Sequence, residues 1–305
     1  MLTYPTRLAV LTTAVAAAVL LLYAATRRVD DATAVAPIPR SWGFVSSGGE
    51  RIYYETAGRG DAVVLCHGAG GNHVVWYQQV PVLARSFRVI TWDQRGFGRS
   101  SNESESGGPS VAVADLRRVL DHLGVDRAHV IGQSMGGWTA LGFAVADPQR
   151  VRSLVLADTT GGISTPAIEA AIDAYIAAAV DAPPPEDLPL GHHPGLDDGF
   201  IRRDPARAFL YQELASLREP VFVGGQVQKN TAYPREAIGG FRFPILFIVG
   251  SRDRIFPPKL IRQAAALAPN ARVIEIAGAG HSPYFEKPES WNAAVLAFLG
   301  DAGEP

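Results

Sequence analysis

One serine in this chain has the sequence context that nucleophilic catalysis requires. Ser134 lies midway between Gly132 and Gly136, after an apolar run typical of a strand and before a run typical of a helix. This G-x-S-x-G spacing indicates a sharp strand-to-helix turn that exposes the serine hydroxyl, because a Cβ at either glycine would crowd the turn. A serine hydroxyl is a weak nucleophile near neutral pH, so it needs an adjacent base and an acid that orients the base.

Asp253 and His281 are the candidates for that acid and that base. Each follows an apolar run predicted to be a strand, so both are expected at the same edge of the sheet as Ser134. Asp158 also ends a predicted strand and is the alternative acid. A serine, an acid and a histidine in these roles would transfer an acyl group through a covalent acyl-serine.

A glycine-rich stretch begins at His67 and ends at Gly71. Glycines leave backbone N–H groups free to face a ligand, since no side chain blocks the approach. The stretch lacks the spacing of a phosphate-binding loop. We expect His67 to be a structural loop residue, and we expect Asp93 and Arg95 to brace a second loop by local hydrogen bonds.

The elements that must position these residues alternate between strands and helices. A turn-like stretch between residues 42–45 and 51–56 predicts a hairpin of two strands, the second with alternating side chains. Mainly apolar runs predict further strands at residues 62–66, 87–92, 128–131, 151–157, 244–249 and 272–276. Helical spacing predicts helices at residues 74–84, 111–123, 135–146, 168–179, 205–217, 258–268 and 288–299. This alternation indicates an α/β fold with a parallel sheet covered on both faces.

The alternation breaks between residues 162 and 240, where no strand-like run is found. We interpret this segment as a mainly helical insertion over the carboxyl ends of the strands, where open α/β sheets bind ligands. Its adjacent His192 and His193 could suggest a metal, but in a loop of proline and glycine we expect them to be solvated.

Composition limits the classes of partner. The chain has 305 residues, of which 47% are hydrophobic and 19% are charged, which suits one large domain with an insertion. The net charge is −2 and no basic stripe is present, so no nucleic-acid partner is expected. The single cysteine, Cys66, excludes an intrachain disulfide and lies in an apolar run, which predicts a buried thiol.

The N-terminal region contains a long uncharged segment at residues 8–25, preceded by Arg7 and followed by Arg27 and Arg28. As a helix it would span roughly 27 Å, close to the ~30 Å hydrocarbon core of a bilayer. We predict a membrane anchor at residues 1–28 and a linker at residues 29–40. The alternative is a cleaved secretory signal, which would leave the protein secreted or periplasmic.

With these motifs in place, the sequence resembles the α/β-hydrolase superfamily, in its cap-bearing branch of esterases, lactonases and epoxide-hydrolase-like enzymes. The resemblance covers about residues 40 to 300 and rests on five motifs, His67-Gly68-Ala69-Gly70-Gly71, Asp93-Gln94-Arg95-Gly96-Phe97-Gly98-Arg99-Ser100, Gly132-Gln133-Ser134-Met135-Gly136-Gly137, Gly250-Ser251-Arg252-Asp253 and Gly280-His281-Ser282-Pro283. It implies an α/β-hydrolase fold, with a mostly parallel eight-stranded sheet and helices on both faces. The core would comprise residues 41–162 and 240–305, and a helical cap would comprise residues 163–239.

The resemblance also implies a role for each site residue. Ser134 would attack a carbonyl, His281 would take the serine proton and pass it to the leaving group, and Asp253 would fix the imidazole tautomer. The backbone N–H groups of Met135 and Ala69, with Gly70 as the neighbouring possibility, would bind the oxyanion. This chemistry requires no metal and no organic cofactor.

Serine at the turn favours small-molecule acyl substrates. Epoxide hydrolases and haloalkane dehalogenases have an aspartate there and form an alkyl ester, whereas Ser134 would form an acyl ester. Carboxylic esters, lactones and thioesters are therefore the expected substrates. The alternatives are a cofactor-free haloperoxidase, a carbon–carbon bond hydrolase, which is less expected because His281 is not followed by a tryptophan-rich stretch, and a non-catalytic relative that binds a ligand.

Overall fold

The computed structural model describes residues 37–69, 71–180, 188–217 and 232–302, and from Pro39 onward the chain forms one unit of internal contacts. The predicted membrane or signal segment at residues 8–25 lies outside the described residues, as does most of the linker. In the part of the chain that the structure describes, no helix is long and apolar enough to cross a membrane.

The centre of the fold is an eight-stranded sheet in the order β1-β2-β4-β3-β5-β6-β9-β10. Its strands are β1 (Arg40–Ser47), β2 (Glu50–Ala57), β3 (Ala62–Cys66), β4 (Arg88–Trp92), β5 (Ala128–Gln133), β6 (Val151–Ala157), β9 (Ile245–Gly250) and β10 (Ala271–Ile276). The first two strands pair antiparallel, β2 pairs antiparallel with β4, and every pair from β4 to β10 is parallel. The predicted mostly parallel eight-stranded sheet is confirmed.

Helices cover both faces of the sheet, as expected from central strands that are mostly apolar. On β3, Val64 packs on one face with residues of α3 (Pro109–His122), α4 (Met135–Ala146) and α10 (Pro258–Ala265). The neighbouring Val63 packs on the other face with residues of α2 (Val80–Leu83) and α12 (Pro288–Asp301). Successive strand residues point to opposite faces, so one apolar run supplies both halves of the core.

The prediction of one continuous helix at residues 74–84 is wrong, because this segment forms two short helices. The structure has a short 3₁₀ helix η1 (His73–Trp76) and a separate α2 (Val80–Leu83). Pro81 lies in the first turn of α2, where its missing N–H costs no helical hydrogen bond, but it could not continue a helix from η1. The proline therefore divides an apolar pattern that resembles one helix.

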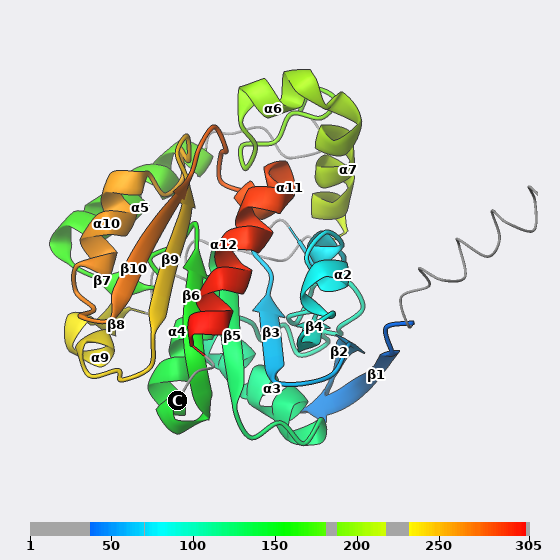
Figure 1. Cartoon of the computed structure of the whole chain (residues 1–305). Coiled ribbons are helices and arrows are strands. Elements are labelled where there is room, and N and C mark those ends of the chain that lie inside the picture. The colour runs from blue at the N-terminus through cyan, green and yellow to red at the C-terminus, as the bar shows by residue number, and fades with distance from the viewer. Residues whose placement is uncertain (1–36, 70, 181–187, 218–231, 303–305) are drawn as a thin grey trace, which may run out of the picture. The chain divides into compact units, whose positions relative to one another are not determined.

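The segment between β6 and β9 is mainly helical, as predicted, with α5 (Pro166–Val180), α6 (Asp198–Arg203), α7 (Pro205–Ser216) and α9 (Arg235–Gly239). The expectation that it has no strand needs a small correction, because the two-residue β7 (Ile163–Ser164) and β8 (Tyr233–Pro234) pair with each other. Such a short bridge requires no apolar run. Figure 1 shows α6 and α7 at the end of the sheet toward which β3 points.

Candidate active site

The turn between β5 and α4 has the strained backbone that the glycine spacing predicts. Ser134 has φ 49° and ψ −120°, and a positive φ is unfavourable for any residue with a Cβ. A Cβ at Gly136 would overlap the backbone oxygen of Cys66, and a Cβ at Gly132 would overlap the backbone oxygen of Gly136. Close packing of α4 on β3 at Gly136, and of β5 on α4 at Gly132, thus excludes side chains at both positions and leaves Ser134 at the turn.

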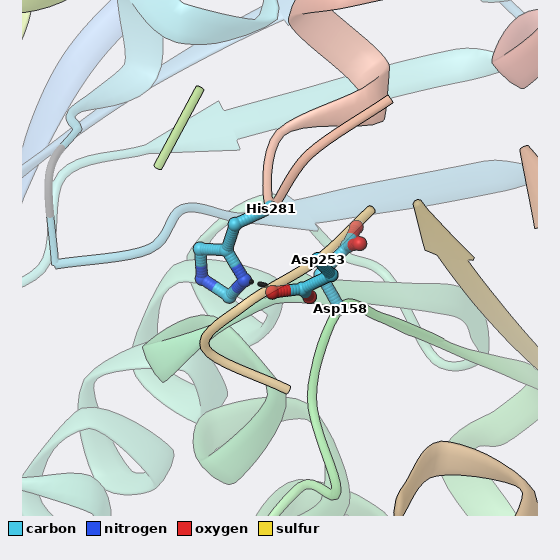
Figure 2. A group of neighbouring side chains, drawn as sticks. All are labelled: Asp158, Asp253 and His281. Carbon is cyan, nitrogen blue, oxygen red and sulfur yellow. Dashed lines mark hydrogen bonds and ion pairs between the residues drawn. The ribbon is translucent and has the colours of Figure 1, made fainter. Parts of the chain in front are cut away.

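Asp253 and His281 lie on the loops that follow β9 and β10, and their side chains are in contact (Figure 2). His281 Nδ1 is 2.9 Å from Asp253 Oδ2, and both side chains are buried. A carboxylate can only accept, so Nδ1 carries the proton and the lone pair of a neutral ring is on Nε2. This is the tautomer that a general base needs.

The Asp253 carboxylate is held in place from its other side. Its Oδ1 accepts hydrogen bonds from the backbone N–H groups of Ile255 (2.8 Å) and Phe256 (2.9 Å). The Phe256 ring stacks near the His281 ring, with centroids 5.9 Å apart and 22° between the planes. Each oxygen of Asp253 therefore has a donor, which fixes the orientation of the carboxylate toward the imidazole.

Backbone contacts hold the two loops together. The N–H of Arg252 donates to the backbone oxygen of Ala279 at 2.8 Å, and Ser251 Oγ accepts from the N–H of Gly278 at 2.8 Å. A Cβ at Gly250 would overlap the backbone oxygen of Gly280. The glycine at the end of β9 thus allows the two loops to approach closely enough for the Asp253–His281 hydrogen bond.

Gln133, which the sequence analysis did not single out, ties three loops together. Its Nε2 donates to the backbone oxygen of His281 at 3.0 Å. A Cβ at Gly68 would overlap Gln133 Oε1 and would lie 3.1 Å from Ser134 Cβ. The glycine-rich loop, the serine turn and the histidine loop therefore meet at one edge of the sheet. No hydrogen bond among the described residues joins Ser134 Oγ to the His281 ring, and such bonds are often long before substrate binds.

The structure describes two of the three predicted oxyanion donors, Met135 and Ala69. Met135 is the first residue of α4, and the first N–H groups of a helix have no acceptor within the helix. Ala69 lies partly exposed in the glycine-rich loop, whose turn is closed by a 3.1 Å hydrogen bond from Gly71 N to Gly68 O. Gly70 lies outside the described residues. The oxyanion role of Met135 and Ala69 stays a prediction.

Asp158, the alternative acid, makes no hydrogen bond to His281. Its Oδ1 accepts from the backbone N–H of Gly250 at 2.9 Å, and its Oδ2 is buried without a hydrogen-bond partner. Burial and the neighbouring Asp253 raise the pKa of Asp158 well above its usual range. The structure therefore favours Asp253 as the acid beside the imidazole. We assign no cation to these three side chains, because the imidazole and the Asp253 carboxylate already bind each other.

A second buried acid near the histidine loop gave no signal in the sequence. Glu286, in the short α11 (Pro283–Glu286), accepts hydrogen bonds from the backbone N–H groups of Gly280 (3.0 Å) and Asp197 (3.2 Å). Burial, above all, raises the pKa of Glu286 from 4.5 to about 7. Asp197 is 89 positions away in the sequence, so only the folded chain shows that Glu286 joins the helical insertion to the histidine loop.

The insertion contacts the same loop through α7. Tyr211 Oη and Ser282 Oγ are 2.7 Å apart in a buried hydrogen bond, and burial raises the pKa of Tyr211 to about 12. His192 is exposed, as predicted, but His193 is half-buried and packs edge-on against Tyr211, which corrects the expectation that it is solvated. The segment carrying α6 and α7 is therefore attached to the residues on both sides of the histidine loop.

His67 has the structural role that was predicted for it. Its Nε2 accepts from the backbone N–H of Gln94 at 3.0 Å, so the proton is on Nδ1, which donates to the backbone oxygen of Gly68 at 2.8 Å. Burial lowers the pKa of His67. Asp93 braces the adjacent loops, as predicted, by accepting from the backbone N–H groups of His73 (2.6 Å) and Arg99 (2.9 Å).

The structure is thus an α/β protein whose sheet carries, at one edge, a strained turn at Ser134 and a hydrogen-bonded Asp253–His281 pair. The family model of the alpha/beta hydrolase fold matches residues 61–182 and 198–288. The chain therefore belongs to the α/β-hydrolase family, and it is a hydrolase of that family.

Relatives in this family differ in their reactions. BpoC of Mycobacterium tuberculosis, a non-heme bromoperoxidase by name, is 31% identical over 272 residues, which cover 81% of this chain and 97% of BpoC. A 2-hydroxy-6-oxononadienedioate/2-hydroxy-6-oxononatrienedioate hydrolase of Cupriavidus pinatubonensis is 30% identical over 281 residues, which cover 82% of this chain and 91% of the relative. A thermophilic esterase from Thermogutta terrifontis has a similar structure, with a TM-score of 0.72 and 26% sequence identity. The match covers 88% of this chain and 100% of the esterase.

Proposed function

We propose that this chain is a serine hydrolase that cleaves an ester-type bond, in a carboxylic ester, lactone or thioester of a small molecule. The observation that carries the proposal is the 2.9 Å hydrogen bond from His281 Nδ1 to Asp253 Oδ2, on loops tied by Gln133 to the strained turn at Ser134. The similar esterase from Thermogutta terrifontis supports the same class of substrate.

The reaction begins with Ser134 Oγ, which attacks the carbonyl carbon while His281 Nε2 takes its proton. The N–H groups of Met135 and Ala69 bind the oxyanion of the tetrahedral intermediate. The imidazolium is stabilised by Asp253 and donates the proton to the leaving oxygen or sulfur, which leaves an acyl-serine. A water molecule, deprotonated by His281, then attacks the acyl-serine, releases the acid and regenerates Ser134.

Labelling with a fluorophosphonate probe tests this proposal on the full chain. We expect the wild type to be labelled and to hydrolyse a chromogenic acyl ester, and we expect Ser134→Ala and His281→Ala to lose both properties. His192→Ala is the matched control, because His192 is exposed and lies in the insertion. A folded wild type that is neither labelled nor active on esters, lactones or thioesters would overturn the proposal.

Carbon–carbon bond hydrolysis is the second candidate, because the Cupriavidus pinatubonensis relative is by name a hydrolase of 2-hydroxy-6-oxo acids. Both candidates use the same serine, so the Ser134→Ala variant does not separate them. Their relative rates on a chromogenic ester and on a 2-hydroxy-6-oxodienoate do so. A bromination assay with acetate and hydrogen peroxide tests the haloperoxidase alternative, which the name of BpoC suggests.

Membrane anchoring by residues 8–25 also stays a proposal. Cell fractionation followed by alkaline carbonate extraction separates an integral anchor from a peripheral protein, and the N-terminal sequence of the mature chain shows whether the segment is cleaved. Retention in the membrane with an intact N-terminus would support an anchor, whereas a mature chain beginning beyond residue 30 would support a signal.

A further inference from the structure

Asp158 occupies an unusual position directly after β6. Its φ is 52°. In the described part of the chain, the residues other than glycine with a positive φ are Glu105, Ser134 and Asp158. Its N–H donates to the backbone oxygen of Ile248 at 2.8 Å, and its Oδ1 accepts from the N–H of Gly250 at 2.9 Å. These two hydrogen bonds fix Asp158 against the end of β9. That strand ends at Gly250, three residues before Asp253.

The carboxyl group of Asp158 lies beside the acid of the candidate triad. Asp158, Asp253 and His281 each place one side-chain atom within 4.8 Å of the others, and Figure 2 shows the three side chains grouped together. Asp158 Oδ2 is fully buried and has no hydrogen-bond partner. A buried polar atom without a partner costs free energy, so this oxygen requires an explanation.

The charges around this pair exclude two ionised carboxylates. No arginine or lysine among the described residues hydrogen-bonds either acid, and the other nearby titratable groups are Glu286, Tyr211 and Tyr284, none of which is a cation. Two buried carboxylates at this separation repel each other strongly unless one of them is protonated. The cation that could face them is the His281 ring in its protonated form.

We propose that Asp158 is a positioning residue that stays protonated and donates its Oδ2–H to the Asp253 carboxylate. This inference rests on the proposed function, in which Asp253 orients His281. The shared proton gives Asp158 Oδ2 its missing partner and leaves the pair with one negative charge. The high pKa of Asp158, caused by burial and by Asp253, agrees with this assignment.

The single charge matters for the base. If both acids were ionised, two negative charges would hold the His281 ring in its protonated form, which cannot accept the proton of Ser134. One charge on Asp253 is enough to fix the tautomer and to stabilise the imidazolium when it forms. Asp158 therefore keeps Asp253 aligned without adding a second charge.

The test compares Asp158→Asn with Asp158→Gly in the full chain. Asparagine tolerates positive φ, and its amide can accept from Gly250 N–H through oxygen and donate to Asp253 through nitrogen, as a protonated Asp158 would. Glycine removes the carboxyl group and also accommodates positive φ, so this variant is not strained at the backbone. Asp126→Asn, at an exposed position, is the matched control.

Two readouts are needed. The first is the NMR titration of the His281 ring, identified by its absence in His281→Ala. The second is the pH profile of kcat and KM on a chromogenic ester. We expect Asp158→Asn to keep the midpoint of the His281 titration within about 0.3 pH units. We expect Asp158→Gly to lower kcat about tenfold with a smaller change in KM, because Asp253 loses a fixed donor.

The outcomes separate this inference from the proposed function. If Asp158 is ionised in the wild type, Asp158→Asn removes a negative charge and lowers the His281 midpoint by about one pH unit or more, which would overturn the inference. Unchanged kcat and unchanged titration in Asp158→Gly would overturn it as well. A wild type without esterase activity would contradict the proposed function, while the NMR titration would still test the shared proton.

Discussion

The side chain of Gln133 donates from Nε2 to the backbone oxygen of His281 at 3.0 Å, although 148 residues separate the two in sequence. Gln133 is the last residue of β5 and precedes Ser134 directly. Its amide oxygen also packs against Gly68 in the glycine-rich loop. One amide thus sets the distance between the predicted nucleophile, the predicted base and the predicted oxyanion loop.

Replacing Gln133 with alanine should therefore misplace the histidine loop. We expect Gln133→Ala to lower kcat on a chromogenic ester by about 10- to 100-fold, with a smaller change in KM, because small displacements of reacting groups are costly. Gln149→Ala is the control, since Gln149 is exposed. Equal kcat values for Gln133→Ala and the wild type would show that other contacts position the loop.

Asp253→Asn should lower kcat by about 10³- to 10⁴-fold. The asparagine amide can donate to Nδ1, which favours the tautomer with its proton on Nε2 and leaves no lone pair to face Ser134. Steady-state rates and the rate of fluorophosphonate labelling should fall together. Asp198→Asn is the control, because Asp198 pairs with Arg254 at the surface. A loss of less than tenfold would transfer the acid role away from Asp253.

Two glycine-to-alanine changes should have opposite effects on stability. Gly136→Ala places a Cβ against the backbone oxygen of Cys66 and should lower the free energy of unfolding by about 2 kcal/mol or more. Gly300→Ala, near the end of α12, meets no atom within 4 Å and should raise it by up to about 1 kcal/mol. Urea unfolding measures both. A Gly136→Ala protein as stable as the wild type would contradict the packing argument.

Glu286 should make the folded state less stable as the pH rises. Burial raises the pKa of Glu286 to about 7, whereas its ordinary value is 4.5. Between pH 4.5 and 7 the folded state binds more protons than the unfolded state. The contribution of Glu286 to the free energy of unfolding is therefore complete below pH 4.5 and is lost as the pH rises through 7. Its full size is about 3 kcal/mol.

His129 should have the opposite effect. Burial lowers the pKa of His129 to about 4 from 6.5, and its Nδ1 lies 2.8 Å from Ser153 Oγ. The neutral ring therefore contributes stability above pH 6.5 that is lost as the pH falls toward 4. Since the two windows overlap between pH 4.5 and 6.5, Glu286→Gln should make the slope of unfolding free energy against pH more positive than in the wild type, and His129→Gln should make it more negative. Urea unfolding across this range measures both slopes, and identical slopes in the two variants would contradict the prediction.

Cys66 should be unreactive in the folded protein. Its thiol is fully buried, and burial raises the pKa of Cys66 to about 12, so the reactive thiolate is scarce. We expect a colorimetric disulfide reagent to detect no thiol in the native protein at pH 8 and one thiol per chain in concentrated guanidinium. Rapid reaction of the native protein would show that β3 opens readily.

The burial of the central strands made much of the fold predictable from the sequence. Apolar runs such as residues 62–66 and 245–249 correspond to β3 and β9, because a strand covered on both faces is apolar at nearly every position. The exception at residues 74–84 arose because an apolar pattern alone does not show where Pro81 interrupts a helix. Glu286 and Gln133 were missed because each bonds to a backbone group far away in the sequence, Asp197 and His281 respectively, and no local pattern encodes such partners.

The sequence by itself determined the strained turn at Ser134, because a glycine two residues to either side is a local steric requirement of that turn. It favoured Asp253 as the acid, because Asp253 lies in the better-matched motif, and kept Asp158 as the alternative. Only the tertiary structure shows the contact itself, in which Asp253 Oδ2 lies 2.9 Å from His281 Nδ1 while Asp158 is buried and makes no hydrogen bond to that ring. The reason is physical, since which carboxyl group meets an imidazole depends on how β6, β9 and β10 pack side by side.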